Sequence, residues 1–197
     1  DCSAMIKMRM IELDAQSPGN DPEFAALARE MYYLMGANMT SILGHDGPDW
    51  RTEDEFRKWR DGVLLAGLVK DTFHLLLVDG QGLRGFLSFS APSGNAEIYV
   101  NEIQIRPSAR KDGVTLRRLV EGFVTRIANL PHETIQTYVN RRNDESQQLI
   151  LKAGFRIESQ AERGTRFTAS KATVLARLRT RRQNNRQQAT LERAPEP

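Results

Sequence analysis

Residues 97–124 combine a strand, a short turn and a long amphipathic helix, and this unit constrains the fold more than any other stretch. The segment 97–105, EIYVNEIQI, is rich in β-branched and aromatic residues, which favour a strand. Pro107 ends it, because proline lacks the N–H group that a sheet ladder needs. Apolar residues then recur at helical spacing and predict one buried stripe: Leu116, Leu119, Val120, Phe123, Val124 and Ile127.

The turn between this strand and helix contains a single glycine, Gly113. The N-terminus of a helix has backbone N–H groups without intrahelical partners and the positive end of the helix dipole, so it favours a phosphate group. Strand–turn–helix units are common in α/β proteins. The glycine therefore indicates a phosphate site only in combination with other signals.

The N-terminal part of the chain predicts one strand and two helices. Residues 6–13 alternate largely between apolar and polar and favour a strand. Asp21 and Pro22 are typical of a helix start, and the apolar stripe of that helix ends near Gly36. Thr52 and Glu55 have capping-box spacing and begin a second helix. The intervening residues 37–51 are expected to form a long loop over an acceptor site.

The remaining segments predict a mostly antiparallel sheet with further helices. The expected strands are 73–78, 83–89, 134–139, 155–160 and 165–169, the last two pairing around Gly164. A short helix is expected from Asn143 or Asp144 to Lys152. Val174, Leu175 and Leu178 allow a last strand or a short helix, and we favour the helix.

Charge is unevenly distributed along the 197 residues. Six arginines against two glutamates give residues 177–197 a charge of +4, whereas the whole chain carries +3. We expect one domain over residues 1–179 and a basic, disordered tail over 180–197. Clustered arginine charge can bind nucleic acid. The tail has no aromatic residue to stack on bases, however, so a solvated terminus is the preferred interpretation.

Cysteine usage and hydropathy bear on the compartment. A single cysteine, Cys2, excludes an internal disulfide and suits a reducing cytoplasm. No apolar run approaches the roughly 18 residues that would cross a bilayer, and the first residues do not have the pattern of a secretory leader. The three histidines have no spacing that suggests a metal site, so none is expected.

Two blocks of the sequence resemble the GNAT superfamily of acyl-CoA N-acyltransferases. The first, Arg110-x-x-Gly113-x-Thr115, is similar to the family's pyrophosphate loop, Gln/Arg-x-x-Gly-x-Gly/Ala. The second, residues 143–155, is similar to the family's Asn-x-x-Ala-x-x-Leu-Tyr-x-x-x-Gly-Phe block. Three positions depart from the pattern: Lys111 stands where glycine is usual, Thr115 where a small residue is usual, and Ile150 where many members have a tyrosine.

The resemblance implies a single α/β domain with a mixed, mostly antiparallel sheet of six to seven strands and about four helices. It implies acetyl-CoA as co-substrate and transfer of its acetyl group to a primary amine in a ternary complex. The acceptor is then a small-molecule amine, a protein N-terminus or a lysine. The cofactor-binding residues implied in this way are Ile103, Gln104, Ile105, Arg110, Lys111, Asp112, Gly113, Val114, Thr115 and Asn143.

The catalytic candidates lie on the central strand and the next strand. Glu97 lies near the position of the base in histone-type relatives, and Glu102 lies closer to the expected acyl group. The alternative for both is a surface carboxylate facing solvent or an arginine. Ile150 cannot donate a proton to the leaving thiolate. Tyr138 is a candidate replacement, although a core or partly buried structural tyrosine is the preferred interpretation.

The sequence leaves three properties open: catalysis, the acceptor and the oligomeric state. The departures at Ile150 and in the loop also fit a non-catalytic acyl-CoA-binding protein that regulates a partner protein. The acceptor would be bound by the first two helices and their loop, where no motif is recognised. A homodimer is compatible with the sequence but is not indicated by it.

Overall fold

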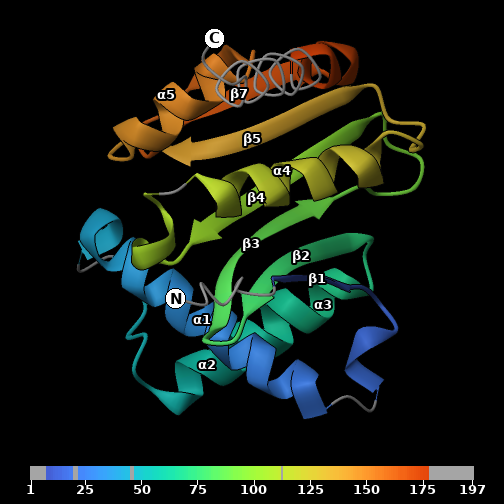
Figure 1. The fold of residues 1–197 in the computed structure, drawn as a ribbon. Coiled ribbons are helices and arrows are strands. Elements are labelled where there is room, and N and C mark those ends of the chain that lie inside the picture. The colour runs from blue at the N-terminus through green and yellow to red at the C-terminus, as the bar shows by residue number, and fades with distance from the viewer. Residues whose placement is uncertain (1–7, 20–21, 45–46, 112, 178–197) are drawn as a thin grey trace, which may run out of the picture.

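The computed structural model describes residues 8–19, 22–44, 47–111 and 113–177, which form one sheet with helices on both faces (Figure 1). The strands are β1 (Arg9–Leu13), β2 (Thr72–Asp79), β3 (Gly82–Ser90), β4 (Glu97–Ile105), β5 (Thr134–Asn140), β6 (Arg156–Gln160) and β7 (Gly164–Ser170). The helices are α1 (Pro22–Leu43), α2 (Glu53–Trp59), α3 (Ala66–Leu68), α4 (Val114–Ile127) and α5 (Asp144–Lys152), with short 3-10 turns at Ser17–Gly19 and Pro107–Ala109 and a π-helical turn at Arg60–Leu65.

The sheet has seven strands in the order β1-β2-β3-β4-β5-β7-β6. Every neighbouring pair is antiparallel except β4 and β5, which are parallel. A parallel pair needs a crossover connection, and α4 supplies it. The predicted order of strands and helices and the mixed, mostly antiparallel sheet are therefore confirmed.

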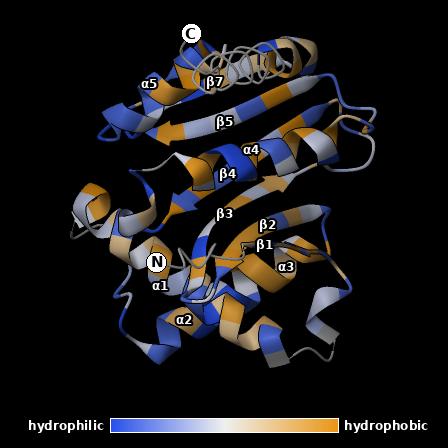
Figure 2. Ribbon diagram, in the orientation of Figure 1, coloured by the Kyte–Doolittle hydropathy of each residue, from blue (hydrophilic) through white to orange (hydrophobic). Residues whose placement is uncertain are grey.

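Two hydrophobic clusters lie on opposite faces of the sheet. On one face α4 packs over β2–β5 through Leu119, Phe123 and Ile127, all of them buried. On the other face α1 and α2 cover β1–β3 through residues such as Met31 and Phe56. Figure 2 shows hydrophobic and hydrophilic residues alternating along α4, as expected of a helix with one buried side. Because neighbouring strand residues point to opposite faces, β2 and β3 contribute to both clusters.

Helix α1 is longer than the sequence predicted. It does not end near Gly36 but continues to Leu43, so most of the expected loop 37–51 is helical. A Cβ atom at Gly36 would lie only 2.8 Å from the Trp50 side chain. The glycine therefore lets the chain before α2 pack against α1, a contact that is not visible in the local sequence pattern.

The second predicted helix begins as expected but is interrupted. Thr52 caps α2, and its hydroxyl accepts a hydrogen bond from the backbone N–H of Glu55. The helix then passes through the π-helical turn Arg60–Leu65 before α3. The predicted strands and the short helix that ends at Lys152 are confirmed to within one to three residues at their ends.

The chain ends are only partly described. Residues 171–177 are helical, which confirms helix over strand for Val174 and Leu175. Cys2, the start of the first predicted strand and the basic tail lie outside the described residues. In the part of the chain that is described, no helix has the length and hydropathy needed to span a bilayer.

Phe89 tests how much the packing of α4 on the sheet contributes to stability. Its ring is fully buried, stacks on Phe73 at 5.3 Å and meets Phe123 edge-on at 5.1 Å. Phe89→Ala should lower the free energy of unfolding by about 3–5 kcal/mol, measured by urea denaturation. Val69→Ala, at a residue that is 75% exposed, should change it by less than about 0.5 kcal/mol. A loss below about 1 kcal/mol at Phe89 would contradict this packing.

Candidate active site

Strands β4 and β5 run side by side for four residues and then diverge. Their pairing begins at Glu97 and Thr134 and ends at Val100 and Thr137. The Thr137 hydroxyl donates to the carbonyl of Val100 at 2.9 Å, which fixes the point of separation. Beyond Val100 and Thr137, β4 and β5 form no further pair among the described residues. The second half of β4 therefore has an edge that its neighbour does not occupy.

A β-bulge lies at the point where the strands separate. The register between β3 and β4 shifts there, because Ser88 opposes Glu102 while Phe89 opposes Val100, which leaves Asn101 as the extra residue. The Asn101 amide donates to the Ser90 hydroxyl at 2.8 Å and anchors the bulge. The shift brings Glu102 and Gln104 to the same face of the sheet as Tyr99.

Glu102 has an unusual environment for a carboxyl group. Burial raises the pKa of Glu102 to about 7. Ser88 lies beside it across β3, and His74 lies beside Ser88 across β2. The Ser88 hydroxyl and His74 Nδ1 are hydrogen-bonded, and burial lowers the pKa of His74 to about 4. The imidazole is therefore neutral at pH 7, and the row contains no positive charge to lower the pKa of Glu102.

Glu97 is held by its neighbours. Its carboxylate accepts hydrogen bonds from the Tyr99 hydroxyl and, at 2.6 Å, from Gln136 Nε2. It lies at the paired start of β4, before the strands diverge. Of the two predicted carboxylates, only Glu102 lies beside the unpaired edge.

Tyr138, the predicted proton donor, does not lie in the core. Tyr138 is 52% exposed and lies against Gly164 of β7, so the expectation of a core or partly buried tyrosine is wrong. Ile150 is partly buried and packs on the hydrophobic cluster beneath α4. Tyr138 itself follows Thr137, where β5 leaves β4, and stays a prediction as a donor.

The turn before α4 has the geometry expected of an open helix N-terminus. Gly113 has φ +62°, the left-handed region that favours glycine, and a Cβ atom there would meet nothing within 4 Å. Thr115 is fully buried, and its hydroxyl accepts from Arg84 Nε at 3.0 Å. The Thr115 side chain therefore faces the protein, and only its backbone N–H is left for a phosphate contact. Asp112 lies outside the described residues.

The other predicted cofactor-binding residues are distributed around this turn. Ile103 and Ile105 pack on the core cluster with their side chains, so a ligand could contact only their backbone groups, and the Ile105 carbonyl already accepts from Asn38 and Arg110. Lys111 is exposed and Val114 is partly buried. Asn143 caps α5, since its Oδ1 accepts from the Ser146 N–H at 3.1 Å. This capping accounts for Asn143 without a ligand.

Asn38 is a residue of this region that sequence reasoning missed. Its Nδ2 donates to Gln104 Oε1 at 2.9 Å and to the Ile105 carbonyl at 3.1 Å. Arg110 Nη2 donates to Asn38 Oδ1 at 2.5 Å. The available signal was a polar residue that continues, at helical spacing, the buried stripe through Met31 and Met35.

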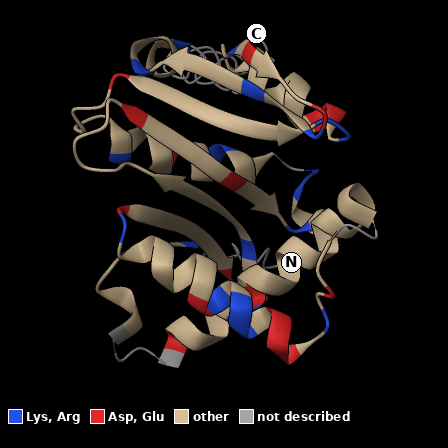
Figure 3. Ribbon diagram, turned by 180° about the vertical axis from the view of Figure 1, so that it is seen from behind, with Lys and Arg blue, Asp and Glu red and all other residues tan. Residues whose placement is uncertain are grey.

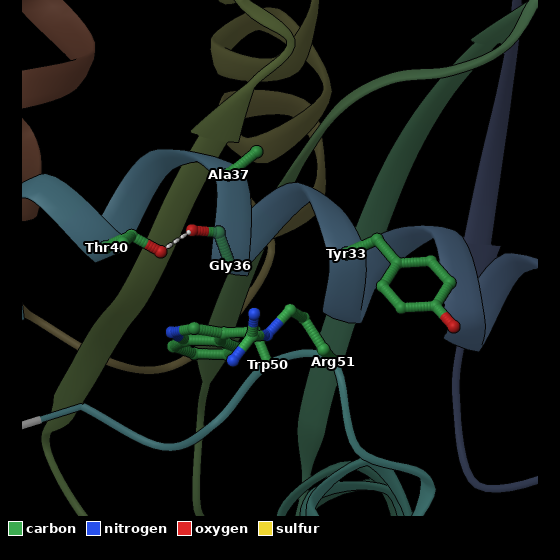
Figure 4. A pocket seen from close by; sticks show the side chains of 6 residues that line it. All are labelled: Tyr33, Gly36, Ala37, Thr40, Trp50 and Arg51. Atoms are coloured by element: carbon green, nitrogen blue, oxygen red, sulfur yellow. Dashed lines mark hydrogen bonds between the residues drawn. The ribbon is translucent and has the colours of Figure 1, made fainter.

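A shallow groove lies elsewhere, between α1 and the chain that leads into α2. It has a volume of about 460 Å³ and is lined by Tyr33, Gly36, Ala37, Thr40, Trp50 and Arg51 (Figure 4). None of the predicted catalytic or cofactor-binding residues lines it, but Ala37, Thr40, Trp50 and Arg51 belong to the segment 37–51 that was expected to lie over an acceptor site. The described residues also contain no group of three or more histidine, cysteine, aspartate or glutamate side chains arranged to hold a metal.

Among the described residues, one face of the sheet has no covering helix at β5. Seen from behind in Figure 3, α1–α3 cover the β1 side of the sheet, and no helix crosses β5. Tyr99 and Gln136 oppose one another on this face. On this face α1 reaches the end of β4, where Asn38 bonds Gln104, so the part of the face without a covering helix lies over β5, whereas α4 covers the opposite face.

The raised pKa of Glu102 has a consequence for stability. The folded state holds this proton up to about pH 7, whereas the unfolded chain releases it near 4.5, so this carboxyl lowers stability as pH rises between those values. The substitution Glu102→Gln should therefore change the free energy of unfolding more favourably at pH 8 than at pH 4.5, and the difference should be about 1–3 kcal/mol. Urea denaturation of both proteins at both pH values measures this. An equal difference between the proteins at the two pH values would show that Glu102 is not buried as described.

Comparisons with known proteins bear on the fold. No family model and no curated protein matches the sequence. Solved structures do match. An acetyltransferase of the GNAT family from Staphylococcus aureus Mu50 aligns with a TM-score of 0.60 and 10% identity over 84% of this chain and 99% of that one. The PaiA N-acetyltransferase of Thermoplasma acidophilum, in complex with coenzyme A, aligns with a TM-score of 0.56 and 15% identity over 84% of this chain and 99% of that one.

A third match is the spermidine/spermine N-acetyltransferase of Vibrio cholerae, in mutant forms, with a TM-score of 0.58 and 15% identity over 87% of this chain and 98% of that one. At such identities the likeness concerns the fold. The alignments span nearly the whole of each neighbour, so the architecture is shared throughout and not in one motif. The chain has the fold of the GNAT acetyltransferases.

Proposed function

We propose that the protein transfers an acetyl group from acetyl-CoA to a primary amine by direct attack within a ternary complex. The observation that carries this proposal is the position of Glu102, a carboxyl group with a pKa of about 7, beside the unpaired edge of β4. The open turn at Gly113 lies at the far end of the same edge. A thioester bound along β4 would have its diphosphate at that turn and its acyl end near the bulge.

The proposed role of Glu102 follows from the chemistry of amines. An amine with a pKa of about 10 is almost fully protonated at neutral pH and must lose a proton before it attacks a thioester. A base with a pKa close to the working pH is partly ionised and still basic enough to accept that proton. Glu102 fits this requirement, directly or through one water molecule.

The remaining steps need little from other side chains. Attack on the thioester carbonyl generates an oxyanion, and a backbone N–H group on the unpaired edge of β4 near the bulge can stabilise it. The thiol of coenzyme A has a pKa near 8.5 by analogy with cysteine, so it can leave as thiolate. Ile150 cannot protonate it, and the Tyr138 side chain is 52% exposed to solvent. Proton return from solvent is therefore sufficient in this scheme.

The first acceptor class to test is a small-molecule amine. A neighbour with this fold is named for spermidine and spermine. A panel should contain diamines, polyamines and amino sugars, together with lysine peptides and peptides with free N-termini as alternatives.

A second candidate function is acyl-CoA binding without turnover. The observation that favours it is Ile150, which packs into the core where many proteins of this kind have a tyrosine proton donor. Such a protein would bind acetyl-CoA in calorimetry yet release no free thiol with any amine. Millimolar acetyl-CoA without a binding signal would contradict both candidates.

Glu102→Gln should lower kcat by roughly 10²–10⁴-fold with an amine that the wild type acetylates, because the side chain can no longer accept a proton. Free thiol release measures the rate. Glu97→Gln is the matched control on the same strand and should stay within a few-fold of wild type, since that carboxylate is held by Tyr99 and Gln136. Loss of activity in the Glu97 variant alone would assign the base to Glu97 instead.

The dependence of the rate on pH provides an independent check. Glu102 must be ionised to act as a base, so kcat/KM should rise with pH as this group ionises near pH 7. The acceptor amine contributes a separate rise towards its own pKa. In the Glu102→Gln variant, only the rise of kcat/KM near pH 7 should disappear. Persistence of that rise would exclude Glu102 as the base.

A further inference from the structure

The C-terminal end of α1 contacts the end of β4 and the turn that follows β5. On the β4 side, Asn38 bonds to Gln104, to the Ile105 carbonyl and to Arg110. On the β5 side, Arg142 Nη1 donates to the Ile42 carbonyl, at 3.4 Å. These contacts exist because α1 continues beyond Gly36. The helix end thus spans the mouth of the gap between β4 and β5.

The hydrogen-bond partners fix the orientation of the Asn38 amide. A guanidinium only donates, so Arg110 must face the oxygen of Asn38. The Ile105 carbonyl only accepts, so it must face the nitrogen. The same nitrogen also donates to the oxygen of Gln104, a side chain only 7% exposed. The arrangement of Asn38, Gln104 and Arg110 therefore follows from which of their atoms can donate and which can accept.

Arg110 is exposed, yet it is held at two points. Its Nη2 donates to Asn38 and its Nε donates to the Ile105 carbonyl at 3.2 Å. A guanidinium has five N–H donors, so three of them have no protein partner among the described residues. The carbonyl of Arg110 also accepts from the N–H of Gly113, which places this arginine on the turn at the start of α4.

We propose that Asn38 is a positioning residue that holds the Arg110 guanidinium ready to bind the diphosphate of acetyl-CoA. The inference rests on the proposed function and adds a residue of α1 to it. A long side chain that is already ordered loses less conformational entropy on binding, by about 0.5–1.5 kcal/mol for a rotamer-rich residue. The planar guanidinium, presented in a fixed orientation, suits phosphate oxygens.

The proposal predicts an effect that is specific to phosphate. Asn38→Ala should weaken acetyl-CoA binding roughly three- to tenfold in calorimetry, which is the entropy gain above expressed as affinity. Binding of acetyl-pantetheine, which lacks the diphosphate, should be unchanged. Ser41→Ala, at an exposed position in the last turn of the same helix, is the control and should leave both affinities unchanged.

A double-mutant cycle separates positioning from a general structural effect. In an Arg110→Ala background, Asn38→Ala should cause no further loss of acetyl-CoA affinity, because its proposed target is absent. Equal weakening of acetyl-CoA and acetyl-pantetheine, or an additive loss in the double variant, would overturn the proposal. Wild-type protein that binds neither ligand would instead overturn the proposed function, and this inference with it.

Asn38→Asp covers the case in which the alanine variant fails to fold. Aspartate has the same size, and its carboxylate would pair with Arg110 and offset the charge available to phosphate. The same selective loss for acetyl-CoA is therefore expected. Retention of full acetyl-CoA affinity in a folded Asn38→Asp protein would also count against the proposal.

Discussion

The parallel pairing of β4 with β5, and its end at Val100 and Thr137, is the constraint on which the rest of the site depends. A parallel neighbour requires a crossover, so the chain must leave the end of β4, cross one face as α4 and return to the start of β5. The N-terminus of α4 is thereby placed at the end of β4 where the two strands have separated. The unpaired edge and the open turn at Gly113 are thus two consequences of one topological choice.

The close approach of α4 to the sheet depends on a small residue in β3. A Cβ atom at Gly85 would lie 2.6 Å from the Gln104 carbonyl oxygen and 3.1 Å from the Thr115 side chain. The first turn of α4 can therefore pack directly on β3, where Arg84 bonds the Thr115 hydroxyl and forms an ion pair with Asp79 at 3.0 Å. Arg106, at the end of β4, bonds the same Asp79 carboxylate at 3.2 Å. This buried network makes the turn before α4 a rigid support.

The sequence predicted the elements well where a local pattern determines them. The stripe in α4, the capping box at Thr52 and the hairpin before Ser90 all depend on neighbours close in the chain, and all are confirmed. The predicted end of α1 was wrong because Gly36 and Asn38 interrupt the apolar pattern. Their partners, Trp50, Gln104 and Arg110, lie between 14 and 72 residues away in the sequence. No local rule contains such contacts.

The two carboxylates of β4 show the same limit in the site itself. Sequence placed Glu97 and Glu102 on one strand but could not rank them, since the difference arises across the sheet. A bulge at Asn101 moves Glu102 onto the face beneath α1, opposite Ser88 and a neutral His74, while Gln136 of β5 binds Glu97. Burial without a cation raises the pKa of Glu102, and the cost in stability persists only because the surrounding sheet is independently well packed. A carboxyl group with a raised pKa beside an unpaired strand edge is typical of a functional site, which supports the role proposed for Glu102.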